Sequence, residues 1–277
     1  MSRIDRPHIS IPTTNRALYP KADPLQRLPE ALERRVRGSL RPKRVLVKKS
    51  GIISLDIQVE QFHNVQYHIA AGITVTFVLI GAIPVINSGL HLVTCQLSRN
   101  SRVTVIQALS GGARVDTHLR FELQGSGAVA NYRGVLFGQA RSQHALHLIM
   151  HHQAPHTSGD ILLKGVYTEQ SKGVITGLIK IDRRAQDTDS YFGDDVLLFD
   201  QGMTASEPML EIEADNVRAS HGSTTGRVNS DQLFYLQSRG LSYQQARYMI
   251  IQGFFQPVLA NAPEAQQAQL SSFIKAL

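Results

Sequence analysis

Between about Val45 and Val228 the chain alternates short apolar runs with turn residues, and little of it has helical periodicity. Apolar and polar residues alternate in Arg102–Val105 and Leu119–Leu123, which is typical of strands with one buried and one solvent-facing side. Turn residues such as Gly111–Gly112 recur roughly every 14–16 residues, which indicates a repeated strand-and-turn unit. The expected strands are Arg44–Val47, Ser54–Val59, Ile73–Ile80, Leu90–Gln96, Arg102–Ala108, Thr117–Leu123, Ala128–Phe137, Ala145–Met150, Asp160–Tyr167 and Gly173–Ile181.

Many short, evenly spaced strands fit a sandwich, a barrel or a β-solenoid. The absence of Trp and the uniform runs of Val, Ile and Leu favour the solenoid, in which each coil stacks aliphatic side chains on the next. We therefore expect a mainly β protein in three parts. Residues 1–43 form a basic, partly helical segment, residues 44–229 a β-solenoid core, and residues 230–277 a C-terminal helical domain.

The C-terminal part has the capping and stop residues of helices. We expect helices over Gln232–Ser238, from Tyr243 to about Ala260, and over Glu264–Lys275. The expected N-caps and stop residue are Ser230 or Asp231, Ser242, and Gly240.

The second helix has apolar residues at a spacing of four, at Ala246, Ile250, Phe254 and Val258, which predicts one buried stripe. Pro257 is expected to kink or end this helix. A helical end-piece would also close the solenoid, because the last coil would otherwise expose an unpaired edge.

The chain carries 29 Lys and Arg residues against 22 Asp and Glu, a formal charge of +7. A basic balance favours an acidic partner, but the excess is concentrated in Arg27–Lys49, around a possible helix at Pro29–Val36. We interpret this run as a solvated N-terminal arm. No aromatic residues interleave with its charges to stack on bases, so nucleic-acid binding is not expected.

The single cysteine, Cys95, excludes an intramolecular disulfide and is compatible with a reducing compartment. The N-terminal residues lack the apolar core of a signal peptide. The longest apolar run, Gly72–Ile86, is interrupted by polar residues and is shorter than the roughly 20 residues that a membrane helix needs. We expect a soluble, cytoplasmic protein without membrane insertion.

Histidines are the first candidates for chemistry, because five of them lie close together. Some have the i, i+4 spacing of a helical ligand pair, but the local pattern indicates strand and loop. Structural roles are therefore expected, with a metal site as the alternative. The five are His144, His147, His151, His152 and His156.

A second candidate is His221, which lies among small residues in Ser220–Gly226. Small neighbours let a ligand approach closely, but a turn that ends the last strand is the alternative. Glu211, Glu213 and Asp215 alternate along a possible strand and indicate a solvated face rather than an acid–base pair. The chain has neither a Gly-x-Ser-x-Gly nucleophile with suitably placed partners nor a phosphate-binding Gly-x-x-x-x-Gly-Lys-Ser/Thr loop. No catalytic residues are expected, and we interpret the protein as a non-enzyme.

Five ordered stretches resemble motifs of the SufB/SufD family of iron–sulfur cluster assembly proteins. The family motifs read H-x-A-P-x-T with KGV, AQxTDAY, PxLEIxADDV, SHGAT and DQLFYLxSRG. The matching residues are His152–Ser158 with Lys164–Val166, Ala185–Tyr191, Pro208–Val217, Ser220–Thr224 and Asp231–Gly240.

The resemblance implies a right-handed parallel β-helix with a C-terminal helical domain. It also implies a scaffold for nascent iron–sulfur clusters that works with SufC, an ABC-type ATPase, and pairs with a SufB-type subunit or with itself near the C-terminal end of the β-helix. The helices after the β-helix would dock on SufC. The residues implied at that contact are Leu233, Phe234, Leu236, Arg239, Tyr243, Ile250 and Phe254.

Within the family, the chain resembles SufD more than SufB. The SufB cysteine position is occupied by Asp194, and the SufB sequence EHEA is replaced by Ala219–Gly222. The resemblance implies that His221 binds a transient cluster shared with the partner, with Asp194 as a weaker oxygen donor. Clusters prefer thiolate ligands, so the partner would supply the thiolates. Cys95 lies outside every matched motif and has no assigned role.

Full SufD proteins are longer, so we expect a compact form of the family. Two alternatives remain at this point. The chain could be a non-assembling structural paralogue. It could also be a carbohydrate-binding β-helix, although that would need an array of carboxylates or arginines on one face, and the sequence has no clear one.

Overall fold

The computed structural model describes residues 42–56, 62–84 and 86–277. The expected N-terminal segment, with its possible helix at Pro29–Val36, lies outside the described residues apart from its last two positions. Within the described part, no helix is long and apolar enough to cross a membrane.

The described core contains two sheets, each of seven parallel strands. The first sheet contains β1 (Lys43–Val47), β3 (Phe62–Ile69), β5 (Ser88–Leu97), β7 (Arg114–Leu123), β9 (Gln143–His152), β11 (Lys172–Ile181) and β13 (Met203–Ile212). The second sheet contains β2 (Gly51–Asp56), β4 (Thr74–Ile83), β6 (Arg102–Gly111), β8 (Val129–Gly138), β10 (Ser158–Tyr167), β12 (Thr188–Leu198) and β14 (Val217–Arg227).

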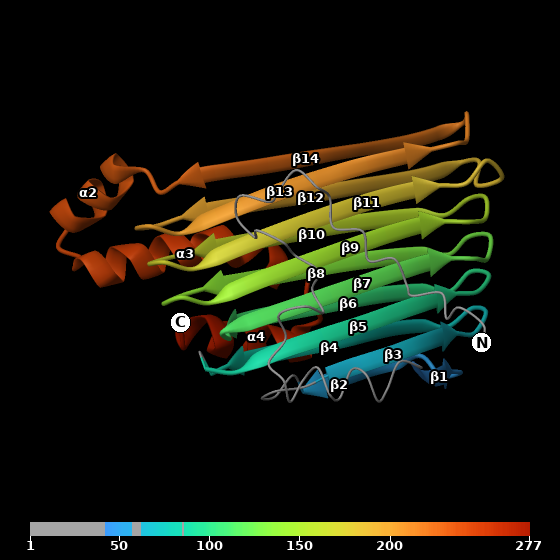
Figure 1. The fold of residues 1–277 in the computed structure, drawn as a ribbon, viewed down its shortest axis with the longest axis horizontal. Coiled ribbons are helices and arrows are strands. Elements are labelled where there is room, and N and C mark those ends of the chain that lie inside the picture. Colours follow the sequence, from blue (N-terminus) through green and yellow to red (C-terminus); the bar gives the residue numbers. More distant parts are fainter. Residues whose placement is uncertain (1–41, 57–61, 85) are drawn as a thin grey trace, which may run out of the picture.

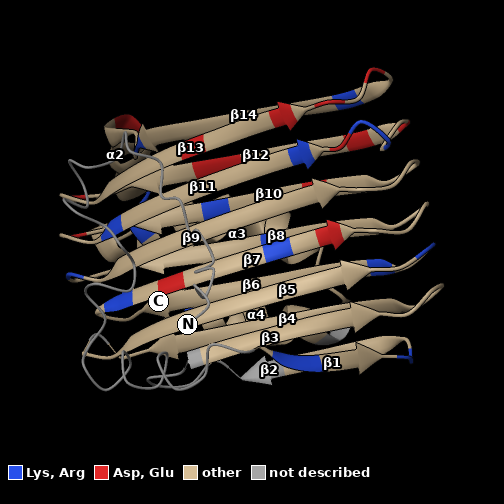
Figure 2. Cartoon of the chain, turned by 45° about the vertical axis from the view of Figure 1, so that its right-hand side comes forward, with Lys and Arg blue, Asp and Glu red and all other residues tan. Residues whose placement is uncertain are grey.

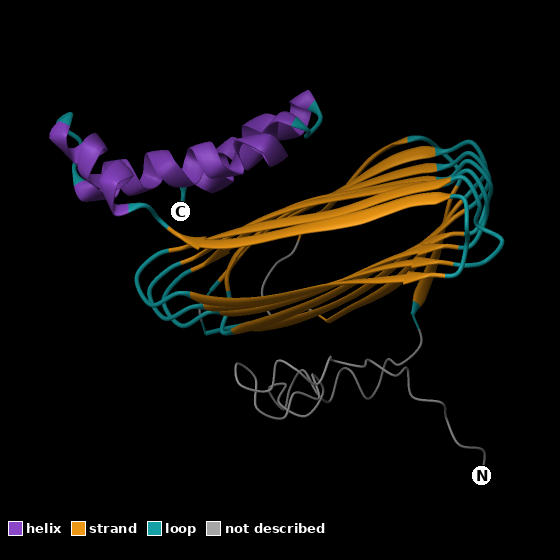
Figure 3. Cartoon of the chain, turned by 90° about the horizontal axis from the view of Figure 1, so that it is seen from above, coloured by secondary structure: helices purple, strands orange, loops and turns teal. Residues whose placement is uncertain are grey.

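Each strand pairs with the strand two places along the chain, so consecutive strands alternate between the two sheets. Val93 of β5 pairs with Leu119 of β7, and Leu119 pairs with Leu148 of β9. The chain therefore winds as a flattened coil (Figures 1 and 3). This confirms the predicted β-solenoid, in which two strand-and-turn units make one coil.

Alternate side chains fill the space between the two sheets, which we call the lumen. On β7, the side chains of Leu119, Phe121 and Leu123 are buried in it. Tyr167 fills the lumen at a point where a Cβ at Gly138 or Gly173 would lie 2.4 or 2.3 Å from its ring atoms. Both positions leave room for this ring because they have no side chain.

Three helices follow the solenoid: α2 (Ser230–Ser238), α3 (Tyr243–Ala260) and α4 (Glu264–Lys275). They confirm the predicted ranges to within two residues. Ser242 caps α3, as predicted, and forms a capping box with Gln245, while Gly240 has the positive φ of 91° expected after a helix end. The prediction for the cap of α2 was wrong by one or two positions. Asn229 caps it, with its side-chain oxygen accepting from the Asp231 N–H at 2.7 Å.

The predicted buried stripe of α3 is confirmed in part, because Ala246 and Val258 are buried. Ile250 and Phe254 are only half-buried, and the buried face extends instead over Ile251, Phe255 and Leu259. Pro257 does not end the helix, which continues to Ala260. The apolar face of α3 is thus wider than a spacing of four suggests.

The predicted end-piece over the last coil was wrong. Helices α3 and α4 lie along the outer face of the second sheet (Figure 3), with α3 against β8 and β10 and α4 against β4. Outward-facing Ile106, Val135 and Val166 form a second core there with Ile251 and Phe255 of α3. The helices pack on this apolar stripe rather than on the last coil, because β14 has mainly polar and small residues and little apolar surface to bury.

Candidate functional site

The last coil consists of β13 and β14 and lies at the opposite end of the stack from β1 and β2 (Figure 1). Among the described strands, β13 pairs only with β11, and β14 pairs only with β12. One edge of each strand therefore keeps backbone groups without a strand partner, and the described lumen is open at this end.

His221 lies in the middle of β14 rather than in a turn. It is paired with Phe192 of β12, whose side chain is buried in the lumen. Paired residues in a parallel ladder point to the same side of the sheet, so His221 points to the lumen at its open rim. Its side chain is exposed because no described coil follows. Below it, Gly177 leaves space for the Phe192 ring, which a Cβ would approach to 2.1 Å.

Asp194 lies one step further along the same row, beneath Ser223 of β14. Its residue surface is fully buried, and the Ser223 hydroxyl donates to its carboxylate at 3.1 Å. Burial raises the pKa of this carboxyl group, while the nearby Ser206 and Ser223 hydroxyl groups and His221 act in the opposite direction. The structure thus places the two predicted site residues on neighbouring strands at the same end of the solenoid.

Ser206 and Ser223 were not predicted as members of this group. Their positions could be found only from the strand register, because Ser206 lies on β13 and reaches the group from the other sheet. The sequence signal that could have found them is that alternate residues of β13 and β14 point into the lumen. This signal can be used only if one inward-facing residue of each strand is already known.

The donor set at this end of the solenoid is one imidazole, on β14, and one buried carboxyl group, on β12. Cys95, the only thiol, is buried in the core on β5, where burial raises its thiol pKa to about 12. It therefore fits neither a thiolate ligand nor this site. Across the described ranges, no three His, Cys, Asp or Glu side chains gather where they could hold a metal ion. The donors fit half of a transition-metal or cluster site, and a second chain would have to complete it.

The acidic cluster is divided by the end of β13. Glu211 lies on the outer face of that strand and pairs with Lys180, whereas Glu213 and Asp215 follow the strand and are exposed. The carboxylates thus belong to a solvated surface, as predicted.

The five clustered histidines are separated by the fold. His144 and His152 point into the lumen, and His147 and His151 lie on the outer side of β9. His144 bonds to a backbone carbonyl, His147 to a threonine hydroxyl and His151 to a carboxylate. His156 occupies a turn with a φ of 58°. This arrangement supports the structural interpretation of these residues.

The hydrogen bonds of His152 account for several residues of the first family motif, His152–Ser158. The Thr157 hydroxyl donates to the Ala154 carbonyl oxygen at 3.1 Å, so it has no hydrogen left for the imidazole. His152 therefore donates from Nδ1 to Thr157 at 2.8 Å and accepts at Nε2 from the Ser190 hydroxyl at 3.1 Å. This network ties the corner before β10 to β12, the strand that carries Asp194.

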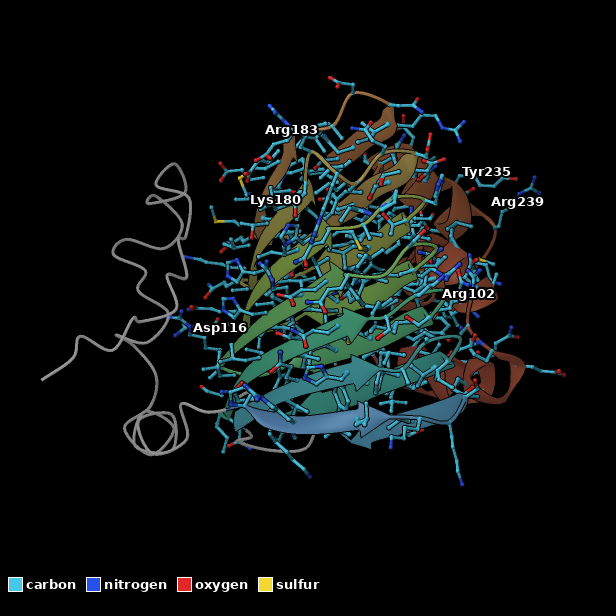
Figure 4. All side chains as sticks on the ribbon, turned by 90° about the vertical axis from the view of Figure 1, so that its right-hand side faces the viewer. Arg102, Asp116, Lys180, Arg183, Tyr235 and Arg239 are labelled. Atoms are coloured by element: carbon cyan, nitrogen blue, oxygen red, sulfur yellow. The ribbon has the colours of Figure 1, made fainter. Side chains whose placement is uncertain are left out.

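A second exposed feature is the surface of α2, which has no buried residue. Phe234 is 74% exposed and Tyr235 is 55% exposed, while Leu233 and Leu236 are half-buried. Arg239 lies over the Tyr235 ring at 5.2 Å. Figure 4 shows Tyr235 and Arg239 pointing away from the solenoid. Tyr235 was not among the predicted contact residues, although it lies within the last matched motif.

The predicted contact residues on α3 divide into two groups. Tyr243 is 43% exposed near α2, and Met249, which was not predicted, is 52% exposed. Ile250 and Phe254 are half-buried against the core between α3 and the second sheet, and Lys164 lies 4.9 Å from the Phe254 ring centre. Their side chains therefore serve the fold first.

Comparison with known proteins gives a family match over residues 54–254, to the model described as "SUF system FeS cluster assembly, SufBD core domain". An iron–sulfur cluster assembly SufBD family protein of Staphylococcus saprophyticus is 32% identical over 157 residues, which are 55% of this chain and 33% of that protein. The iron–sulfur cluster assembly protein SufB of Bacillus subtilis is 33% identical over 127 residues, which are 46% of this chain and 27% of that protein. The chain thus aligns with about a third of the length of these relatives.

The buried histidines predict a pH-dependent stability. Burial is the main cause that lowers the pKa of His152 to about 3 from its usual 6.5, with His151 adding to the effect. Below pH 6.5 the unfolded chain binds a proton that the folded chain does not, so the free energy of unfolding falls as the pH falls. Each such histidine contributes a slope of about 1.4 kcal/mol per pH unit between roughly pH 6 and 4.

Replacing His152 by Gln removes one group that takes up a proton only in the unfolded chain. The free energy of unfolding of the variant should therefore fall less steeply on acidification than that of the parent chain. Urea unfolding at several pH values measures the slope. His91→Gln provides a second test, because burial also lowers the pKa of His91 to about 3. Equal slopes in the parent chain and both variants would contradict this account.

Proposed function

The chain belongs to the SufBD family of the SUF iron–sulfur cluster assembly system, and we propose that it is a SufD-like scaffold subunit that offers half of a cluster site. Proteins of this family are assembly components, and we assign no catalytic step to this chain. It works in the cytoplasm with protein partners.

The observation that carries the proposal is the position of His221 at the open rim of the lumen, next to buried Asp194. The cluster is the cargo of this site. His221 offers an exposed imidazole nitrogen, and Asp194 offers a weaker oxygen donor when it is ionised. The thiolates come from a SufB-type partner, because Cys95 is buried elsewhere.

The partner pairs with the last coil. An edge strand that ends a sheet presents backbone N–H and C=O groups to another chain. The edges of β13 and β14 border the rim that carries His221, so a chain that pairs there also brings its own ligands to the site. A SufB-type subunit fits this role, and a second copy of this chain fits the backbone pairing but supplies no accessible thiol.

A SufC-type ABC ATPase docks on α2 and the start of α3. Support comes from the exposed aromatic residues Phe234, Tyr235 and Tyr243, since aromatic side chains with an arginine are enriched at the centres of protein interfaces. Leu233, Leu236 and Arg239 complete this surface, and Ile250 and Phe254, which are half-buried against the core beneath α3, lie at the margin of α3.

We do not assign a nucleic-acid or membrane partner. In the view of Figure 2, charged residues of both signs are scattered along the described strands and at turns, without a continuous basic stripe. The alternative with specific support is a structural paralogue that pairs with its partner without binding a cluster, because the described donors are too few for a site of their own.

His221→Ala separates these two functions. In a complex with a SufB-type subunit and a SufC-type ATPase, anaerobic reconstitution should leave the variant with about tenfold less bound cluster, because a direct ligand is lost. Visible absorption and bound iron per complex measure this effect. His156→Asn is the control, since it replaces an exposed histidine and asparagine tolerates a positive φ. A normal cluster content in an intact His221→Ala complex would favour the structural paralogue.

Phe234→Ser tests the docking surface. Loss of a 74% exposed aromatic anchor should weaken binding to the ATPase by about tenfold or more, measured by titration of the purified partners. Gln269→Ser, at an exposed position of α4, is the matched control. Phe and Ser have similar helix propensities, so the variant should keep α2. Unchanged affinity for the ATPase would refute the assignment of this surface.

A further inference from the structure

Three successive turns of the solenoid build a cleft that the proposed function does not use. The turns join β8 to β9, β10 to β11 and β12 to β13, at the end from which α2 projects (Figure 1). In each of them one residue has a positive φ, at Ala140, Glu169 and Asp200. The turns therefore share one conformation and stack in register.

The shared conformation places side chains in two parallel rows. In the first turn, Ser142 points inward and is 1% exposed, so the residues on either side of it point outward. The same pattern repeats around Ser171 and Gly202. Backbone hydrogen bonds hold the rows together, since the Lys172 N–H donates to the Ser142 carbonyl and the Met203 N–H to the Ser171 carbonyl.

The two rows flank an open surface cleft of about 380 Å³, a volume within the range of small-molecule sites. One row is Arg141, Gln170 and Gln201, and the other is Gln143, Lys172 and Met203. The lining thus contains a guanidinium, an ammonium and three amides, and it contains no carboxylate.

The hydrogen bonds leave the lining rich in donors. Arg141 Nε donates to the side-chain amide oxygen Oε1 of Gln170 at 3.0 Å, which orients the Gln170 side-chain N–H₂ group away from the guanidinium. A guanidinium beside a carboxamide and an ammonium can surround an anion with donors of different geometry.

Acidic groups next to the cleft are partly neutralised. Asp200 accepts the Glu169 backbone N–H at 3.2 Å and lies 3.7 Å from the Arg247 guanidinium. Its backbone carbonyl accepts from Arg227 at 2.7 Å. Glu169 itself is exposed on the adjoining row, and its negative charge opposes an anion in the cleft.

We propose that this cleft binds a small oxyanion with two or more negative charges. Arg141 and Lys172 hold the charges, and the amides of Gln143, Gln170 and Gln201 orient the oxygens. A phosphate-type and a carboxylate-type ligand share this chemistry. The size of the cleft and the absence of aromatic residues in its lining favour a small molecule over a nucleic acid.

Isothermal titration of the full chain with pyrophosphate and, separately, with citrate tests the proposal. One of the two anions should bind at a single site with a submillimolar Kd, and the preferred one identifies the ligand type. The double variant R141Q/K172Q should weaken this binding by about tenfold or more. The variant E169Q should strengthen it by about twofold, because it removes the opposing charge from an exposed side chain.

The matched control is R183Q/R184Q, which removes two exposed positive charges from the turn between β11 and β12, at the other end of the solenoid (Arg183 in Figure 4). Its affinity for the anion should equal that of the parent chain. The proposal is overturned if neither anion binds. It is also overturned if the control loses as much affinity as R141Q/K172Q, or if E169Q, whose exposed position does not threaten folding, leaves the affinity unchanged.

Discussion

The parallel backbone ladder between successive coils is the constraint on which the rest of the structure depends. It places each residue directly beside a residue of the next coil. Paired residues therefore face the same side of the sheet, either the lumen or the outside, along the whole stack. The buried position of Phe192 therefore decides where His221 points. The last strand of each described sheet has backbone N–H and C=O groups on one edge without a strand partner. The candidate ligands lie at this end of the solenoid.

This constraint explains what could be read from the sequence and what could not. Runs such as Arg102–Ala108 were predicted as strands because apolar and polar residues alternate at their start, and the structure buries most of the run on both faces. Strands β3, β12, β13 and β14 were not delimited in advance, because polar residues such as Asn64, Asp194 and Glu211 interrupt their apolar pattern. Two of these strands, β13 and β14, form the last described coil, where one edge of each strand has no described strand to pair with.

The placement of the helices, unlike their ranges, was not predicted, for a different reason. Their ranges followed from local caps such as Ser242, but their placement depended on a stripe of outward apolar residues that local patterns do not reveal. The family motifs likewise have two physical roles. The His152 side chain holds a corner of the scaffold through hydrogen bonds to Thr157 and Ser190. The His221 side chain is exposed and makes no side-chain hydrogen bond to the described residues. A motif match alone would not distinguish these roles.

The central claim is that a partner chain completes the last coil. Amide hydrogen exchange, compared between the free chain and its complex with a SufB-type subunit, tests it most directly. The account predicts that amides of Val217–Arg227 and Met203–Ile212 exchange more slowly in the complex, while those of Lys43–Val47 at the other end do not change. Unchanged exchange in β13 and β14, or slower exchange confined to β1, would contradict the account.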